Sequence, residues 1–169
     1  MSQSLTALRP VAERDHPVLS ELRQDVVLQR MLLGAAEPIT EPVADWLTRR
    51  AAAGWIMTVT DAADTCLGYV QLFDRHDNNR TAWFGICLAL QARGRGHGRA
   101  ATLQTLEIAR TEMNLRKVSL KVRADNPASR LYSRLGFRAV GTQRAEYDDG
   151  ATLHDVVIME YLFDGRSAA

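Results

Sequence analysis

A short glycine-rich segment constrains this chain more than any other feature of its sequence. In Arg93-Gly94-Arg95-Gly96-His97-Gly98-Arg99, three glycines alternate with basic or imidazole side chains. An apolar run over 83–90 precedes the segment and a helical pattern over 100–113 follows it. Glycine lets a backbone turn sharply and approach a ligand, and the start of a helix presents unpaired N–H groups at the positive end of its dipole. The sequence therefore predicts an anion site, with a phosphate or pyrophosphate as its natural ligand.

Length and charge exclude several other kinds of site. With 169 residues, of which 46% are apolar, the chain is long enough for one domain with its own core. We expect a single domain over 1–169, with its core over about 4–163 and a tail over 164–169. A net charge of +1 provides no overall basic field for nucleic acid. The sequence also shows no signal pattern and no apolar run of membrane length, so we expect no membrane partner and a cytoplasmic location.

The two cysteines do not indicate a metal site or a disulfide framework. Cys66 and Cys87 lie inside apolar runs and belong to no CxxC pair. We interpret both as reduced core residues and expect no metal. Cys87 as a nucleophile is the minor alternative, because no neighbouring residue in the sequence would activate its thiol.

Apolar spacing predicts an α+β domain with one mixed sheet flanked by helices. The expected order is strand, two helices, three strands, helix, strand, helix and two strands. The strands are expected over 5–10, 55–60, 66–73, 81–88, 117–122, 137–144 and 154–163, and the helices over 15–31, 41–53, 97–113 and 126–135. In the strand over 81–88, alternation places Phe84, Ile86 and Leu88 on one face. Trp83, Gly85 and Cys87 then lie on the other.

Two nucleotide-binding motifs fit the glycine segment poorly. A P-loop requires a Lys followed by Ser or Thr after the last glycine, whereas Arg99 and Ala100 follow Gly98. Gly96-x-Gly98-x-x-Ala101 satisfies the loose dinucleotide fingerprint. That fold normally places its loop after the first strand, and here four expected strands come before it. Both nucleotide alternatives are therefore disfavoured.

Two blocks of the sequence together resemble one family. Arg93-x-x-Gly96-x-Gly98 resembles the acetyl-CoA pyrophosphate loop of the GNAT N-acetyltransferases, whose pattern is Gln/Arg-x-x-Gly-x-Gly/Ala. The block Asn126-Pro-Ala-Ser-Arg-Leu-Tyr132-Ser-Arg-Leu-Gly136-Phe137 resembles the family's later segment. The element order along nearly the whole chain also matches, and with it the mostly antiparallel sheet of that fold. The ending over 146–160 is similar to the branch that acetylates ribosomal-protein N-termini and polyamines.

The resemblance implies acetyl transfer from acetyl-CoA to a primary amine by direct attack. The acceptor stays open among a protein N-terminus, a polyamine, an amino sugar, an amino acid and an antibiotic. A non-catalytic CoA-binding or sensor module on the same fold is the alternative, and a homodimer is common in the family. The implied cofactor contacts are Arg93, Gly94, Arg95, Gly96, His97, Gly98 and Arg99, then Cys87, Leu88, Ala89 and Leu90, and Asn126 and Ser129. His97 as a solvent-facing spacer and Asn126 as a helix N-cap remain alternatives.

Tyr132 is the expected catalytic residue. It lies about 100° round its helix from Leu131, an apolar position, which would aim it at the opening in the sheet. A phenol near the thioester sulfur can protonate or hydrogen-bond the leaving thiolate. The base is open, because Trp83 stands where the similar branch often carries a Glu. A water chain or another carboxylate would remove the proton of the amine, or the amine would arrive already neutral from an alkaline medium. The carboxylates expected to border the acceptor are Glu37, Glu41, Glu146 and Asp148.

Overall fold

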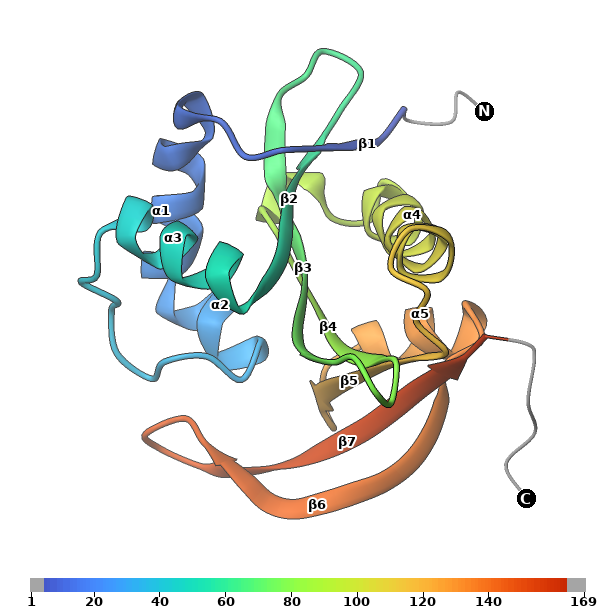
Figure 1. Cartoon of the computed structure of the whole chain (residues 1–169). Coiled ribbons are helices and arrows are strands. Elements are labelled where there is room, and N and C mark those ends of the chain that lie inside the picture. Colours follow the sequence, from blue (N-terminus) through green and yellow to red (C-terminus); the bar gives the residue numbers. More distant parts are fainter. Residues whose placement is uncertain (1–4, 164–169) are drawn as a thin grey trace.

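A seven-stranded sheet with helices on both faces forms the chain (Figure 1). The computed structural model describes residues 5–163, with strand order β1-β2-β3-β4-β5-β7-β6. The strands are β1 (Ala7–Arg9), β2 (Gly54–Thr60), β3 (Cys66–His76), β4 (Thr81–Leu88), β5 (Lys117–Arg123), β6 (Arg138–Asp148) and β7 (Leu153–Leu162). The helices are α1 (His16–Gln24), α2 (Val26–Met31), α3 (Val43–Ala53), α4 (His97–Thr111) and α5 (Ala128–Arg134). The β4–β5 pair is parallel and the other pairs are antiparallel, which confirms the predicted fold class.

The described residues include nearly all of the expected core over about 4–163. Ser4 and the predicted tail over 164–169 lie outside the described residues. Two short 3-10 turns, η1 (Glu13–Asp15) and η2 (Leu90–Ala92), complete the order of elements.

The sheet separates two apolar clusters, as the alternation along β4 predicted. Phe84 and Leu88 pack in the cluster beneath α4 and α5. Cys87 packs in the other, beneath α1 and α3, with Leu19 and Trp46. Figure 1 shows these two groups of helices on opposite sides of the central strands.

The predicted first helix over 15–31 is wrong in one respect, because Asp25 divides it. The backbone of Asp25 is extended, with ψ 93°, and its carboxylate accepts a hydrogen bond from the N–H of Leu28 at 3.0 Å. A short acidic side chain competes with the helical hydrogen bond in this way and starts a new helix. The chain therefore has α1 and α2 where one helix was expected.

Strands β4 and β5 part beyond Trp83. Their pairing covers only Thr81, Ala82 and Trp83. On its other side β4 stays paired with β3 as far as Ala89, whose N–H donates to the carbonyl of Leu67 at 2.9 Å. Hydrogen-bonded positions alternate along an antiparallel pair. The N–H groups of the residues at 84, 86 and 88 therefore face the opening between β4 and β5.

A buried carboxylate joins β1, β2 and the start of α1. Asp15 is 1% exposed and accepts hydrogen bonds from both terminal nitrogens of Arg9, at 2.7 and 2.9 Å. The N–H of Ala12 and the hydroxyl of Thr58 each donate to it at 2.9 Å. Burial acts to raise the pKa of Asp15, but Arg9 and these donors outweigh it and lower the pKa to about 2. The contact anchors α1 and the helices that follow it to the sheet.

Candidate active site

Two cavities meet at Tyr132. The loop cavity, of about 690 Å³, lies between the glycine segment, β4 and α5. The strand cavity, of about 540 Å³, lies between β3, β4, β5 and the helices α2 and α3. Both are lined by Leu32, Ile86, Asn126 and Tyr132. The two cavities thus meet at the gap where β4 and β5 part.

Glycine backbone forms part of the wall of the loop cavity. Gly94 and Gly96 have φ of +71° and +88°, which favours glycine. Helix α4 begins directly after Gly96, and no side chain among residues 5–163 caps its first turn. The N–H groups of Gly98 and Arg99 therefore lie at the positive end of a 15-residue helix. That geometry is of the kind expected for an anion site.

Gly98 keeps this cavity open. A Cβ atom at Gly98 would lie 3.6 Å from Cδ1 of Leu88 and 3.7 Å from Cδ2 of Leu131. These are ordinary contact distances, so alanine would fit, but a longer side chain would fill the space between β4 and α5.

The structure brings most of the predicted loop residues to the cavity. Those that line it are Leu88, Arg93, Gly94, Gly96, Gly98, Arg99 and Asn126. Arg93 also closes the loop on its strand, because Nε and a terminal nitrogen both donate to the carbonyl of Leu88 at 3.1 Å. Arg95 is exposed and does not line the cavity.

The side chain of His97 turns away from the loop cavity. It is 4% exposed, and its Nδ1 lies 2.9 Å from the hydroxyl of Thr6, just before β1. The predicted alternative of a solvent-facing spacer is therefore wrong.

Four other predicted contacts do not reach the cavity. Cys87 is 1% exposed, and burial raises the pKa of its thiol to about 12. It is a neutral core thiol, as interpreted from the sequence, and its backbone faces β3. Ala89 uses its N–H on Leu67, Leu90 is 77% exposed, and the hydroxyl of Ser129 donates to the carbonyl of Asn126.

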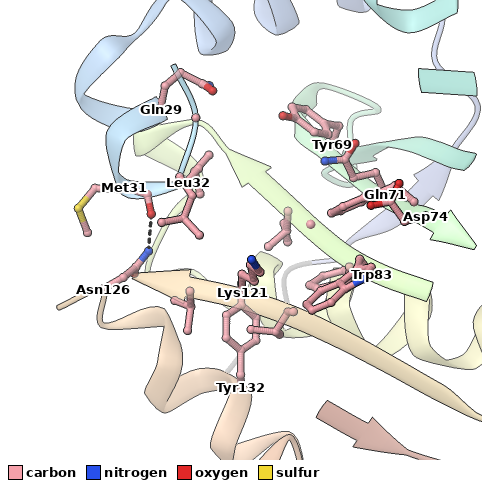
Figure 2. Close-up of a pocket in the computed structure, with 18 of the residues that line it drawn as sticks. Gln29, Met31, Leu32, Tyr69, Gln71, Asp74, Trp83, Lys121, Asn126 and Tyr132 are labelled. Carbon is pink, nitrogen blue, oxygen red and sulfur yellow. Dashed lines mark hydrogen bonds between the residues drawn. The ribbon is translucent and has the colours of Figure 1, made fainter. Parts of the chain in front are cut away.

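Asn126 holds two elements together. Its Oδ1 accepts from the N–H of Ala128, the first residue of α5, at 2.9 Å, although Pro127 holds the N-cap position itself. Its Nδ2 donates to the carbonyl of Met31 at 3.0 Å (Figure 2). The end of α2, which walls the strand cavity, is thereby tied to the start of α5, which walls the loop cavity.

Tyr132 occupies the junction between the cavities. Its ring packs edge-on against Phe84 and Phe137, with centroids 6.3 and 5.7 Å away. Figure 2 shows the ring directed from α5 into the strand cavity. Burial raises the pKa of Tyr132 to about 12, so the phenol is neutral and able to donate at physiological pH.

The strand cavity is walled by side chains that the motifs did not reveal. Tyr69, Gln71 and Phe73 come from alternate positions of β3 and share one face of the sheet. Gly85 pairs with Gln71, and a Cβ there would lie 2.9 Å from Nε2 of Gln71. Gly85 thus leaves room for the amide. A polar Gln within a strand of apolar residues was the signal that the sequence offered.

Asp74 is the one carboxylate among the residues that line either cavity. It follows Phe73 at a register shift between β3 and β4, and its φ is +48°. The expected strands over 66–73 and 81–88 left it in the connection between them, so it was not predicted as a site residue. The neighbouring Trp83 forms part of the wall (Figure 2). Its indole has an N–H donor only and takes no proton.

The carboxylates expected from the sequence lie elsewhere. Glu41 is shared by Arg23 and Arg49 at 3.0 and 2.8 Å, and Glu146 pairs with Lys121 at 3.3 Å. Neither of these, nor Glu37 or Asp148, lines the strand cavity.

The chain matches the model of the "Acetyltransferase (GNAT) domain" family over residues 6–138. It belongs to the GNAT acetyltransferase family. A spermidine N(1)-acetyltransferase of Vibrio cholerae is 32% identical over 105 residues, 62% of this chain and 61% of that enzyme. A mycothiol acetyltransferase of Actinosynnema mirum is 38% identical over 94 residues, 55% of this chain and 30% of that enzyme. The chain thus matches less than two thirds of the length of either relative.

A solved GNAT structure extends the likeness to the whole fold. The spermidine N-acetyltransferase of Vibrio cholerae in complex with CoA and spermine has a TM-score of 0.86 and 25% identity, over 96% of both chains. The family and the polyamine-like branch predicted from the sequence are both confirmed by these relatives.

Within residues 5–163, no helix has the length and apolar character needed to cross a membrane. In the same range, no cluster of three or more His, Cys, Asp or Glu side chains suits a metal ion. The cytoplasmic location remains a prediction.

Proposed function

We propose that this GNAT protein transfers acetyl from acetyl-CoA to a small primary amine by direct attack, without a covalent enzyme intermediate. The observation that carries the proposal is the meeting of two cavities at one phenol. One cavity ends in a backbone anion site and the other in polar side chains. A donor and an acceptor entering from opposite faces of the sheet would meet beside Tyr132.

The loop cavity would hold the co-substrate. The N–H groups of the first turn of α4 suit the pyrophosphate, with Arg93 and Arg99 beside them. The narrow space over Gly98, between Leu88 and Leu131, suits an extended pantetheine arm. The N–H of Ile86 faces the opening and would donate to the thioester oxygen as it becomes an oxyanion. Ile86 was not singled out from the sequence.

Tyr132 would stabilise the leaving thiolate mainly as a hydrogen-bond donor. The pKa of this phenol, about 12, lies well above the value of about 8.5 that is usual for a thiol. Complete proton transfer to the thiolate is therefore unfavourable, whereas a charge-assisted hydrogen bond is favourable. The ammonium formed when the amine attacks would supply the proton that the thiol finally keeps.

Asp74 would attract the cationic amine and accept its proton through water. It is the carboxylate closest in the pairing register to Trp83, the position at which the sequence lacked an acid. A neutral amine is required for attack, so a carboxylate at the mouth of the strand cavity supports this role.

The test is release of free thiol from acetyl-CoA with a panel of amines. Spermidine comes first on the panel, because the relatives act on it. Turnover with any amine supports the proposal. Tight CoA binding with no turnover across the panel supports the sensor alternative. A thermal shift with NAD and none with CoA would overturn both.

We also propose that the protein forms a homodimer through β6. This strand lies at the edge of the sheet, most of its side chains are exposed, and Val140 is 53% exposed. Long edge strands pair readily with a second chain. Light scattering after size exclusion should show twice the mass of one chain. A charged residue in place of Val140 should reduce the measured mass to that of a single chain.

A further inference from the structure

We infer that the acceptor amine carries a carboxylate, and that Arg50 binds it. The inference rests on the proposed acetyl transfer and narrows its acceptor. A polyamine has several positive charges and no negative one, so the two kinds of acceptor make opposite demands on the wall of the strand cavity.

Arg50, on α3, is the cation in that wall that forms no ion pair with any of residues 5–163. Its Nε is buried and has no hydrogen-bond partner among residues 5–163. Its guanidinium packs over the ring of Phe73, with 5.8 Å to the centroid. Arg23 and Arg49 share Glu41, and Lys121 pairs with Glu146, but Arg50 takes part in none of these ion pairs. The two terminal nitrogens of Arg50 are in no hydrogen bond or ion pair with any of residues 5–163, and Arg50 lines the cavity, so a ligand carboxylate there would meet them.

Gln71 offers the complementary group in the same cavity. Its Oε1 is buried and likewise has no partner among residues 5–163. Gln71 pairs with Gly85, beside the opening through which Tyr132 is reached. An amine held beside the amide of Gln71 would therefore stand close to the thioester. Phe73, under the guanidinium of Arg50, lies two residues further along the same face of β3.

The charge of the wall fits this arrangement. Among residues 5–163, the charged side chains that line the strand cavity are Arg50, Lys121 and Asp74. Lys121 is paired with Glu146, so Arg50 and Asp74 are the charges left for a ligand. An amine with a carboxylate finds Arg50 for one end and Gln71 with Asp74 for the other. Spermidine brings several positive charges and no anion for Arg50, which is unfavourable in a partly buried site. An Arg guanidinium also matches a carboxylate with two parallel hydrogen bonds.

The experiment compares amines that differ only in the carboxylate. Glycine, β-alanine and 4-aminobutyrate are each assayed beside the corresponding primary amide, with spermidine as the polyamine. Thiol release gives kcat/KM, and the variants are Arg50→Met, Arg50→Lys and the neighbouring Arg49→Met. We expect at least one acid to exceed its amide by about tenfold or more, the usual strength of a charge-assisted hydrogen bond. Arg50→Met should bring that ratio close to one, Arg50→Lys should retain part of it, and Arg49→Met should leave it unchanged.

The ratio of acid to amide does not depend on how much of a variant is folded. Equal rates for every acid and its amide, a preference for spermidine, or an unchanged ratio in Arg50→Met would each overturn the inference while acetyl transfer stands. Absence of thiol release with every amine would instead overturn the proposed function. In that case the inference falls with it, so the two failures are distinguishable.

Discussion

The two cavities that meet at Tyr132 are built by different means. The loop cavity is built around one short segment, with two glycines of positive φ and a first turn of α4 that no side chain among residues 5–163 caps, and side chains of β4 and α5 complete its wall. The strand cavity is formed by side chains from α2, α3, β3, β4 and β5. A backbone site suits a ligand common to a whole family, since it tolerates changes in the other side chains. A side-chain site suits a ligand that differs from one member to the next.

The largest expected effect tests the backbone half of this comparison. Gly98→Leu should weaken CoA binding by more than about a hundredfold, because the side chain fills the space between Leu88 and Leu131. Gly98→Ala is the matched control, since its Cβ meets only ordinary contacts. Calorimetric titration with CoA measures both. Equal binding by the two variants would show that CoA does not pass over Gly98.

The next effect concerns the junction. Tyr132→Phe should lower kcat about thirtyfold, the loss of one hydrogen bond to a charged group, with little change in KM. A pKa of about 12 places the ionisation of Tyr132 above the working range. Wild-type kcat should therefore show no alkaline fall due to this residue below that pH. Full turnover by Tyr132→Phe would rule out its role as donor.

The third effect concerns the Asp15 contact, which anchors α1 and the helices that follow it to the sheet. Asp15→Asn should destabilise the fold by about 2 kcal/mol at neutral pH, from the lowered pKa of the native carboxylate. Because the folded pKa is lowered to about 2, this stability is present above the ordinary pKa of Asp, near 4, and is lost as the pH falls toward 2.

Urea unfolding of wild type and Asp15→Asn from neutral to acidic pH measures that difference. It should shrink between about pH 4 and pH 2. A constant difference across that range would contradict the role of the Asp15 carboxylate. Binding of CoA to the folded variant should be unchanged, because Asp15 does not line the loop cavity.

The smallest effect tests the proton route. Asp74→Asn should lower kcat/KM about tenfold near neutral pH, less than the roughly hundredfold or more of a base in direct contact, because Asp74 would act through water. The loss should diminish at alkaline pH, where more of the amine is already neutral. Asp77→Asn, on the same hairpin and paired with Arg75, is the control. The same loss at every pH would argue against a role for Asp74 in proton removal.

Much of the fold followed from periodicity. The alternation of Phe84, Ile86 and Leu88 against Trp83, Gly85 and Cys87 was read correctly, because each strand has a period of two. The break at Asp25 was missed, because apolar spacing continued across it while the carboxylate capped a new helix. His97 was misread for a related reason: its hydrogen bond to Thr6 joins residues far apart in the chain.

The sequence by itself predicted most of the residues that line the proposed donor half of the site. Positive φ, a helix start and an apolar strand are local properties, so Gly94, Gly96 and the residues after them could be interpreted without a structure. Tyr132 could be placed because it lies on a short helix with a clear apolar edge. Only the tertiary structure showed the residues of the proposed acceptor half. Arg50, Gln71 and Asp74 follow no shared spacing and become one wall because β3 and β4 pair, α3 packs over Phe73, and β5 parts from β4.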